Sequence, residues 1–143
     1  MIKPVIERRV RDANAQIKAT RKALEMPEAH GLLILVNDGN YAFPHETVLN
    51  LMSRCLKGGN FSAIKWYMYF AANMPSTLPG FNRDVRVFGS GPRHEGLQRL
   101  GLGGLCERLF QSWCQLESQL LGRPFDVFQA SDPKIIDSIT YRR

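Results

Sequence analysis

Apolar side chains recur at helical spacing through the first 24 residues. Positions three or four apart lie on one face of a helix, and here this face carries Ile6, Val10, Ala13, Ile17, Thr20 and Leu24. The pattern predicts a helix that Pro27 stops, because proline cannot continue the hydrogen bonding of a helix.

A continuous apolar run, Gly31–Val36, follows. A short run without polar alternation predicts a strand buried on both faces of a sheet that helices cover. Asn37–Asn40 supplies a turn after this strand. A second helix is predicted from about Pro44 to Lys57, closed by Gly58–Gly59. Its inward positions are Val48, Leu51, Met52, Cys55 and Leu56.

Residues 63–72 alternate between two kinds of side chain, which predicts a strand with two unlike faces. Ile64, Trp66, Met68 and Phe70 point one way, and Lys65, Tyr67 and Tyr69 point the other way. Residues 73–80 form a loop. A short strand is then predicted over residues 84–88, ending in Gly89–Pro92.

A long helix is predicted from Leu102 to Leu121, and residues 125–128 form a last strand. The apolar face of this helix consists of Leu102, Leu105, Leu109, Trp113, Leu116 and Leu120. The polar segment 130–143 is expected to dock as a C-terminal arm. The element order α-β-α-β-β-α-β predicts a single α/β layered domain over residues 1–143, with a mixed sheet flanked by helices.

Charge adds a candidate surface to this fold. The formal net charge is +6, and residues 1–24 hold seven bases against two acids, a net +5. Arg8, Arg11, Lys18 and Lys22 share one face of the first helix, roughly 140° from its apolar stripe at about 100° per residue. Such a row could follow the phosphates of DNA or RNA, whereas the alternative is a solvated face that keeps the chain in solution.

Tyr67 and Tyr69 alternate with Lys65 and could stack on nucleic-acid bases. In an α/β sheet such tyrosines more often lie beneath a helix, with their hydroxyl groups at its rim.

Two turns offer weaker candidate sites. Asp38, aided by Asn37 and Asn40, could bind a ligand or cation beyond the end of its strand, and Gln16 completes this candidate pocket. The alternative is a turn whose side chains bond their own backbone. Residues 89–94 resemble a phosphate-binding loop, but Pro92 removes an amide and the further glycine is absent, which favours a structural loop.

No catalytic set is legible, and no cofactor or metal site is predicted. His30, His45 and His94 are scattered, and no serine occupies a nucleophile elbow. Cys55, Cys106 and Cys114 lack the spacing of a disulfide framework or a zinc site, which predicts buried thiols. No stretch approaches the ~18 apolar residues that span a bilayer. We therefore expect a cytoplasmic protein without a membrane partner.

The segment Gln16–Thr20, followed by the strand Leu32–Val36, resembles the later half of a PD-(D/E)XK nuclease-like core. Gln16 and Thr20 match the Q-x-x-x-[YT] signature that members of this superfamily carry on the helix after their catalytic strands. Glu7-Arg8-Arg9 is the nearest approach to the family's E-x-K, but it falls in the predicted helix and no aspartate precedes it. The resemblance covers residues 1–40 and implies a module that lacks the catalytic hairpin.

Three hypotheses follow from the sequence. The first is a non-catalytic, nuclease-like module that contacts nucleic acid through its basic helix. The second is a protein-interaction module that binds a copy of itself or a partner subunit. The third is a small enzyme with its site at the Asn37–Asn40 turn.

Overall fold

The computed structural model describes residues 2–38, 45–74, 85–122 and 126–129. The elements, in chain order, are α1 (Lys3–Ala23), β1 (Gly31–Asp38), α2 (His45–Gly58), β2 (Ile64–Met74), β3 (Val85–Pro92), the 3-10 helix η1 (Glu95–Leu100), α3 (Gly103–Leu121) and β4 (Asp126–Gln129). Apart from the short helix η1, this is the predicted order. The predicted loop 73–80 from Pro75 onward, the turn positions Gly39 and Asn40, and the arm 130–143 lie outside the described residues.

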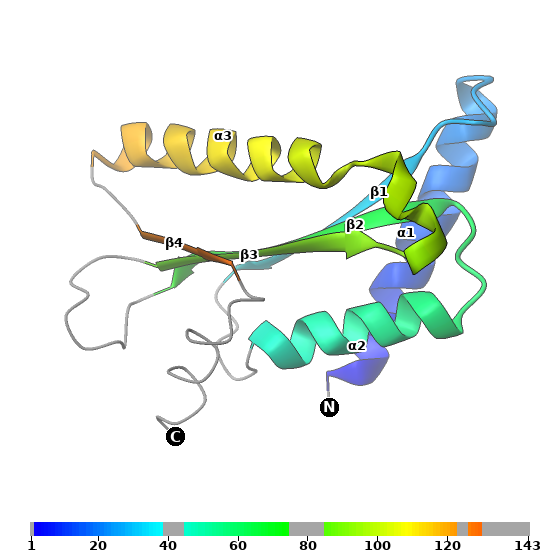
Figure 1. Cartoon of the computed structure of the whole chain (residues 1–143), viewed down its shortest axis with the longest axis horizontal. Coiled ribbons are helices and arrows are strands. Elements are labelled where there is room, and N and C mark those ends of the chain that lie inside the picture. The colour runs from blue at the N-terminus through cyan, green and yellow to red at the C-terminus, as the bar shows by residue number, and fades with distance from the viewer. Residues whose placement is uncertain (1, 39–44, 75–84, 123–125, 130–143) are drawn as a thin grey trace.

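The four strands form one mixed sheet in the order β1-β2-β3-β4. β1 pairs with β2 in parallel, β2 with β3 antiparallel, and β3 with β4 in parallel. α1 and α2 lie on one face of the sheet and α3 lies on the other (Figure 1). The predicted α/β layered architecture, with a mixed sheet between helices, is therefore confirmed.

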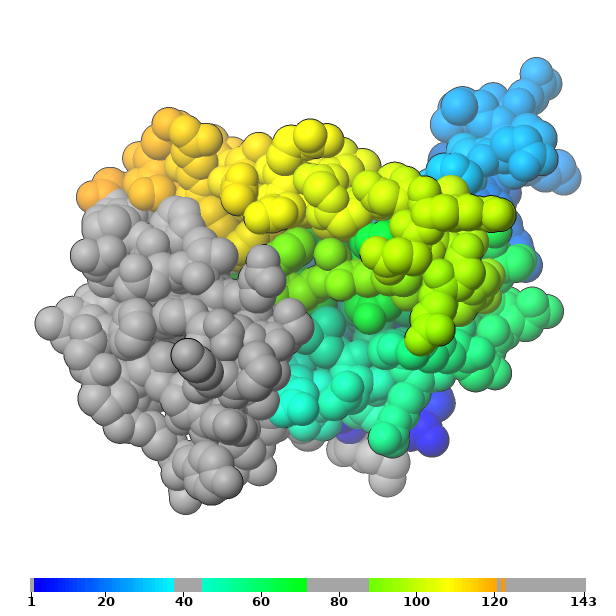
Figure 2. All heavy atoms as spheres, viewed as in Figure 1, coloured from blue at the N-terminus to red at the C-terminus, as the bar shows by residue number. Residues whose placement is uncertain are grey.

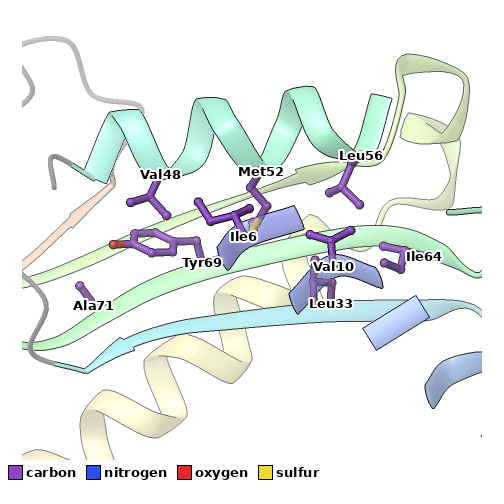
Figure 3. Packing of buried hydrophobic residues seen from close by; sticks show 9 residues of the cluster. All are labelled: Ile6, Val10, Leu33, Val48, Met52, Leu56, Ile64, Tyr69 and Ala71. Carbon is purple, nitrogen blue, oxygen red and sulfur yellow. The ribbon is translucent and has the colours of Figure 1, made fainter. Parts of the chain in front are cut away.

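One core fills the space between α1, α2 and the sheet. Val48, Met52 and Leu56 of α2 point onto the sheet, and Tyr69 of β2 lies beneath them (Figure 3). The other buried members are Ile6, Val10, Leu33, Ile64 and Ala71. Every third or fourth residue of α2 thus packs inward, as its sequence pattern predicts.

A second core lies between the sheet and α3. Phe110 of α3 stacks on Phe88 of β3, with ring centroids 4.7 Å apart, and tilts against Phe70 of β2 at 5.8 Å. Cys106 and Cys114 lie one turn before and after Phe110, and both are buried as predicted. These small thiols let the helix lie close to the sheet while the phenylalanine ring fills the gap.

Most of the predicted apolar face of the last helix does not pack on the sheet; its first member, Leu102, does pack against the second core. Leu105, Leu109, Trp113, Leu116 and Leu120 are all exposed. The buried face consists of Cys106, Phe110 and Cys114, one position further along the helix. Apolar side chains therefore cover a wider arc of α3 than the sheet can cover, and the stacked phenylalanine rings occupy the buried part of that arc.

The prediction that residues 31–36 form a strand buried on both faces is wrong for one face. Leu33 faces the first core and is buried, whereas Ile34 and Val36 on the opposite face are each 48% exposed. β1 is an edge strand of the sheet, and α3 packs over β2 and β3 instead. On the side of α3, only the start of the strand is covered, where Leu32 packs against the second core, whereas Ile34 and Val36 are exposed.

Three smaller expectations are also wrong: the orientation of Ile64, the inward position of Thr20 and Leu24, and the loop at Gly89–Pro92. Ile64 packs with Leu33 in the first core rather than with Trp66, because the ladder shifts register between Gly31 and Leu32. Thr20 and Leu24 of the predicted helix stripe are exposed, and Leu24 lies just beyond the last residue of α1, Ala23.

The predicted loop Gly89–Pro92 is the second half of β3, and it pairs with β2. Gly91 lies opposite Tyr67 in this ladder, and a side-chain carbon built on it would lie 3.0 Å from the tyrosine hydroxyl oxygen. Glycine thus makes room here for a tyrosine ring, which is a packing role rather than a turn.

We expect the two adjacent residues Phe110 and Leu109 to differ sharply in their effect on stability. Phe110→Ala should lower the free energy of unfolding by about 3–5 kcal/mol, because it empties the centre of the second core. Leu109→Ala should lower it by less than about 1 kcal/mol, because this side chain is already exposed. Urea unfolding at submicromolar protein, followed by tryptophan fluorescence, measures both. A larger decrease for Leu109→Ala would show that the leucine face packs on the sheet.

Candidate functional site

The basic face of α1 consists of Arg8, Arg11, Lys18 and Lys22, and the structure leaves all four side chains exposed. The rise of a helix places Arg8 and Lys22 about 21 Å apart along its axis. The buried residues Ile6, Val10 and Asn14 occupy a different arc of the helix. The four cations therefore form a row that solvent, and any ligand in solution, can reach.

Two exposed ion pairs lie along α1. Nε of Arg8 lies 3.9 Å from a carboxylate oxygen of Asp12, and Nζ of Lys3 lies 3.8 Å from Glu7. Exposed pairs of this length hold their partners weakly. Within the described residues, Arg11, Lys18 and Lys22 have no carboxylate within ion-pair distance. The charge of the basic face is therefore available to a phosphate ligand.

A groove of about 540 Å³ between α1 and α2 extends this surface. Arg11 lies on one side of it and Arg54 of α2 on the other, and both Lys3 and Glu7 also line it. Arg54 brings a fifth cation to the edge of the basic face. The sequence shows an arginine on a helix here, but only the packing of α2 beside α1 places it on the same groove as Arg11.

Cys55 also lines this groove. Burial raises the pKa of its thiol, and the Glu7 carboxylate adds to this rise, whereas Arg11 and Lys3 act against it. The thiol therefore stays protonated at neutral pH. It is part of the groove wall rather than a nucleophile.

Not every base of the first helix belongs to this surface. Arg21 turns inward and donates a hydrogen bond of 3.0 Å to the carbonyl oxygen of Ala63. The backbone N–H of Ala63 donates to Oδ1 of Asn14 at 3.2 Å. Two polar side chains of α1 thus satisfy both backbone groups of the residue before β2, and Arg21 has a structural role.

The four residues of the predicted pocket do not come together as one site. Gln16 is exposed and lines a different hollow, about 330 Å³ in volume, together with His30 and Gly31. Gly31 begins β1, and Asn37 lies about 20 Å away near the other end of that strand. The side chain of Asp38 and the whole of Asn40 lie outside the described residues.

Asn37 instead joins a buried polar cluster that the sequence did not predict. Its Nδ2 donates to the hydroxyl oxygen of Tyr69 at 3.2 Å, and that oxygen lies 2.5 Å from Nδ1 of His45. Tyr69 is fully buried, so it cannot stack on a nucleic-acid base, contrary to that interpretation. Tyr69 instead lies beneath α2, which was the alternative that the sequence left open.

Burial determines the protonation of this cluster. It lowers the pKa of His45 to about 4, and it raises the pKa of Tyr69 to about 12, with the Asn37 hydrogen bond acting against the rise. A neutral imidazole can accept at Nδ1, so the directed chain runs from the Asn37 amide to the Tyr69 hydroxyl to His45. The rings of Tyr69 and His45 are both buried, and this series of hydrogen bonds joins the end of β1 to the start of α2.

Residues 89–94 do not form the phosphate-binding loop that they resemble in sequence. Gly89–Pro92 is strand, and Arg93 bonds back to β2. Nε of Arg93 donates to the carbonyl oxygen of Ile64 at 2.8 Å, and its backbone N–H donates to Lys65. The guanidinium group therefore ties the start of β2 to the end of β3.

Comparisons with protein families, curated proteins and solved structures find no match for this chain. Within residues 2–38, 45–74, 85–122 and 126–129, no group of three or more His, Cys, Asp or Glu side chains could hold a metal ion. No described helix is both long and apolar enough to cross a membrane.

The low pKa of His45 predicts a pH-dependent stability. Between pH 4 and 6.5 the unfolded chain binds a proton that the folded chain does not bind, so the free energy of unfolding rises with pH across this window. This contribution is complete above pH 6.5 and disappears as the pH falls toward 4; it amounts to about 3 kcal/mol.

The test compares His45→Gln with His30→Gln by urea unfolding from pH 4 to 7. His45→Gln should flatten the slope, whereas His30→Gln, at an exposed position, should keep it. Equal slopes in the two variants would mean that His45 is not the group responsible.

Proposed function

We propose that this chain binds nucleic acid by contacts from the basic face of α1 to backbone phosphates, continued by Arg54 of α2. The observation that carries the proposal is the exposed row Arg11, Lys18 and Lys22, which has no carboxylate partner among the described residues. Cations that replace the counterions of phosphates give affinity that depends on salt and little on base sequence.

The groove between α1 and α2 supports the same ligand. Arg11 and Arg54 line its two sides, and guanidinium groups bind phosphate oxygens through paired N–H donors. A phosphate seated between them would extend the row of contacts from one helix to two. Lys3 adds positive charge at the groove, although Glu7 offsets part of it.

We propose a binding role rather than strand cleavage. The resemblance of Gln16 and Thr20 to the PD-(D/E)XK nuclease-like signature points to the same class of ligand. Glu7, the nearest counterpart of that family's catalytic glutamate, lies on an exposed helix face and pairs with Lys3. Among the described residues, Glu7 belongs to no group of three or more His, Cys, Asp or Glu side chains that could hold a catalytic metal ion.

Two double variants with the same change in net charge test the proposal. Lys18→Glu/Lys22→Glu removes two cations from the basic face, whereas Arg99→Glu/Arg108→Glu reverses two exposed cations on η1 and α3. Binding to fluorescein-labelled duplex DNA and single-stranded RNA is measured by anisotropy over a salt series. The first variant should reduce the slope of log affinity against log salt by about 2, roughly one for each phosphate that the variant no longer neutralises.

The second variant should keep the wild-type slope, because Arg99 and Arg108 lie on η1 and α3, outside the basic face. Equal reductions in the two variants would mean that net charge, rather than the basic face, attracts the nucleic acid. The absence of salt-dependent binding in the wild-type protein would overturn the proposal itself.

Arg54→Glu separately tests the groove. It should weaken binding and reduce the salt slope by about 1, because the variant neutralises one phosphate fewer. Lys57→Glu, on the last turn of the same helix and outside the groove lining, is the matched control. Equal effects of the two changes would mean that the groove does not hold a phosphate.

A further inference from the structure

A row of exposed apolar side chains crosses the side of the molecule opposite α1. We call it the α3–β1 face. Its members are Ile34, Val36, Leu105, Leu109, Trp113, Leu116 and Leu120. Figure 2 shows α3 (yellow to orange) as a ridge along one margin of the surface. Exposed apolar patches on this scale mark interaction sites.

The two parts of this face are adjacent. The Trp113 ring lies 6.2 Å from the ring of Phe70, and Phe70 is the ladder partner of Val36. Ile34 pairs in the same way with Met68, which packs beneath α3. The exposed side of the helix therefore borders the exposed side of the edge strand, and together they form one surface.

This face is poor in charge. Only Glu107, Arg108 and Glu117 are charged within α3, and Asp38 is the only charged residue of β1. The exposed polar positions of α3 are instead glutamines and serines, such as Gln111, Ser112 and Gln115. A surface with so few charged residues meets its own copy with little like-charge repulsion, and charged residues are depleted in the cores of interfaces.

The exposed area suits a dimer. With about 150–250 Å² for a whole large side chain, and between two fifths and four fifths of each exposed, the seven residues present roughly 700 Å². Two such faces bury about 1,400 Å², within the range of about 1,200–2,000 Å² for specific interfaces. Trp113 lies near the middle of the row, where interfaces concentrate their binding energy.

We propose that the α3–β1 face binds a second copy of this chain in a two-fold symmetric dimer. In such a dimer the same patch contributes from both subunits, so each Trp113 packs against apolar residues of its partner. Among the described strands, β1 pairs only with β2, so its outer edge lies beside the same interface. The inference does not depend on nucleic-acid binding.

The test is the mass of the full chain by light scattering across a dilution series. The wild-type protein should change from dimer to monomer on dilution. Trp113→Glu and Leu116→Glu should each raise the dimer dissociation constant at least about 30-fold, as expected for a central interface residue. Leu24→Glu, at a position just after α1 that is 63% exposed, should leave the constant unchanged.

A second measurement uses the wild-type protein alone. Trp66 is buried and Trp113 is 49% exposed, so acrylamide quenching of tryptophan fluorescence reports chiefly on Trp113. Quenching should increase on dilution as the dimer dissociates. A monomer at every concentration, with constant quenching, would overturn the proposal. A dimer that survives Trp113→Glu unchanged would overturn it as well.

Discussion

The structure depends on β2, the strand that is buried on both faces. Its alternating side chains supply Tyr69 to one core and Trp66, Met68 and Phe70 to the other, so both helical layers pack on the part of this strand between Ile64 and Ala71. α1 fixes the start of the strand, because Asn14 and Arg21 bond both backbone groups of Ala63. A strand that lies between two cores must be apolar on both sides. The edge strand β1 beside it is only partly covered.

That constraint explains which elements the sequence could predict. Element order, strand alternation in β2 and the inward face of α2 follow from local periodicity, because each of these elements has one dominant environment. The buried face of α3 does not follow from local periodicity, because the apolar arc of this helix is wider than the area of sheet that it can cover. Periodicity alone favoured the leucine row over the narrower row of Cys106, Phe110 and Cys114. Only the positions of Phe70 and Phe88 decide which row packs.

The candidate sites divide in the same way. The basic face was predictable because four cations on one helix need only the helix to align them. The place of Arg54 beside Arg11, the inward turn of Arg21 and the bond from Tyr69 to His45 each join segments far apart in the chain. No local pattern distinguishes an arginine that bonds a distant carbonyl from one that faces solvent. The same holds for a histidine that burial keeps neutral.

The two proposed surfaces lie on opposite faces of the sheet, and this arrangement has a consequence for binding. A dimer formed through the α3–β1 face buries none of the four cations of the basic face, because none of them belongs to the α3–β1 face. It would also carry two basic faces on one particle. Two modest phosphate-binding faces on a rigid pair bind a long nucleic acid more tightly than either alone, because the second face binds at high effective concentration. Self-association and nucleic-acid binding would then reinforce one another without a shared residue.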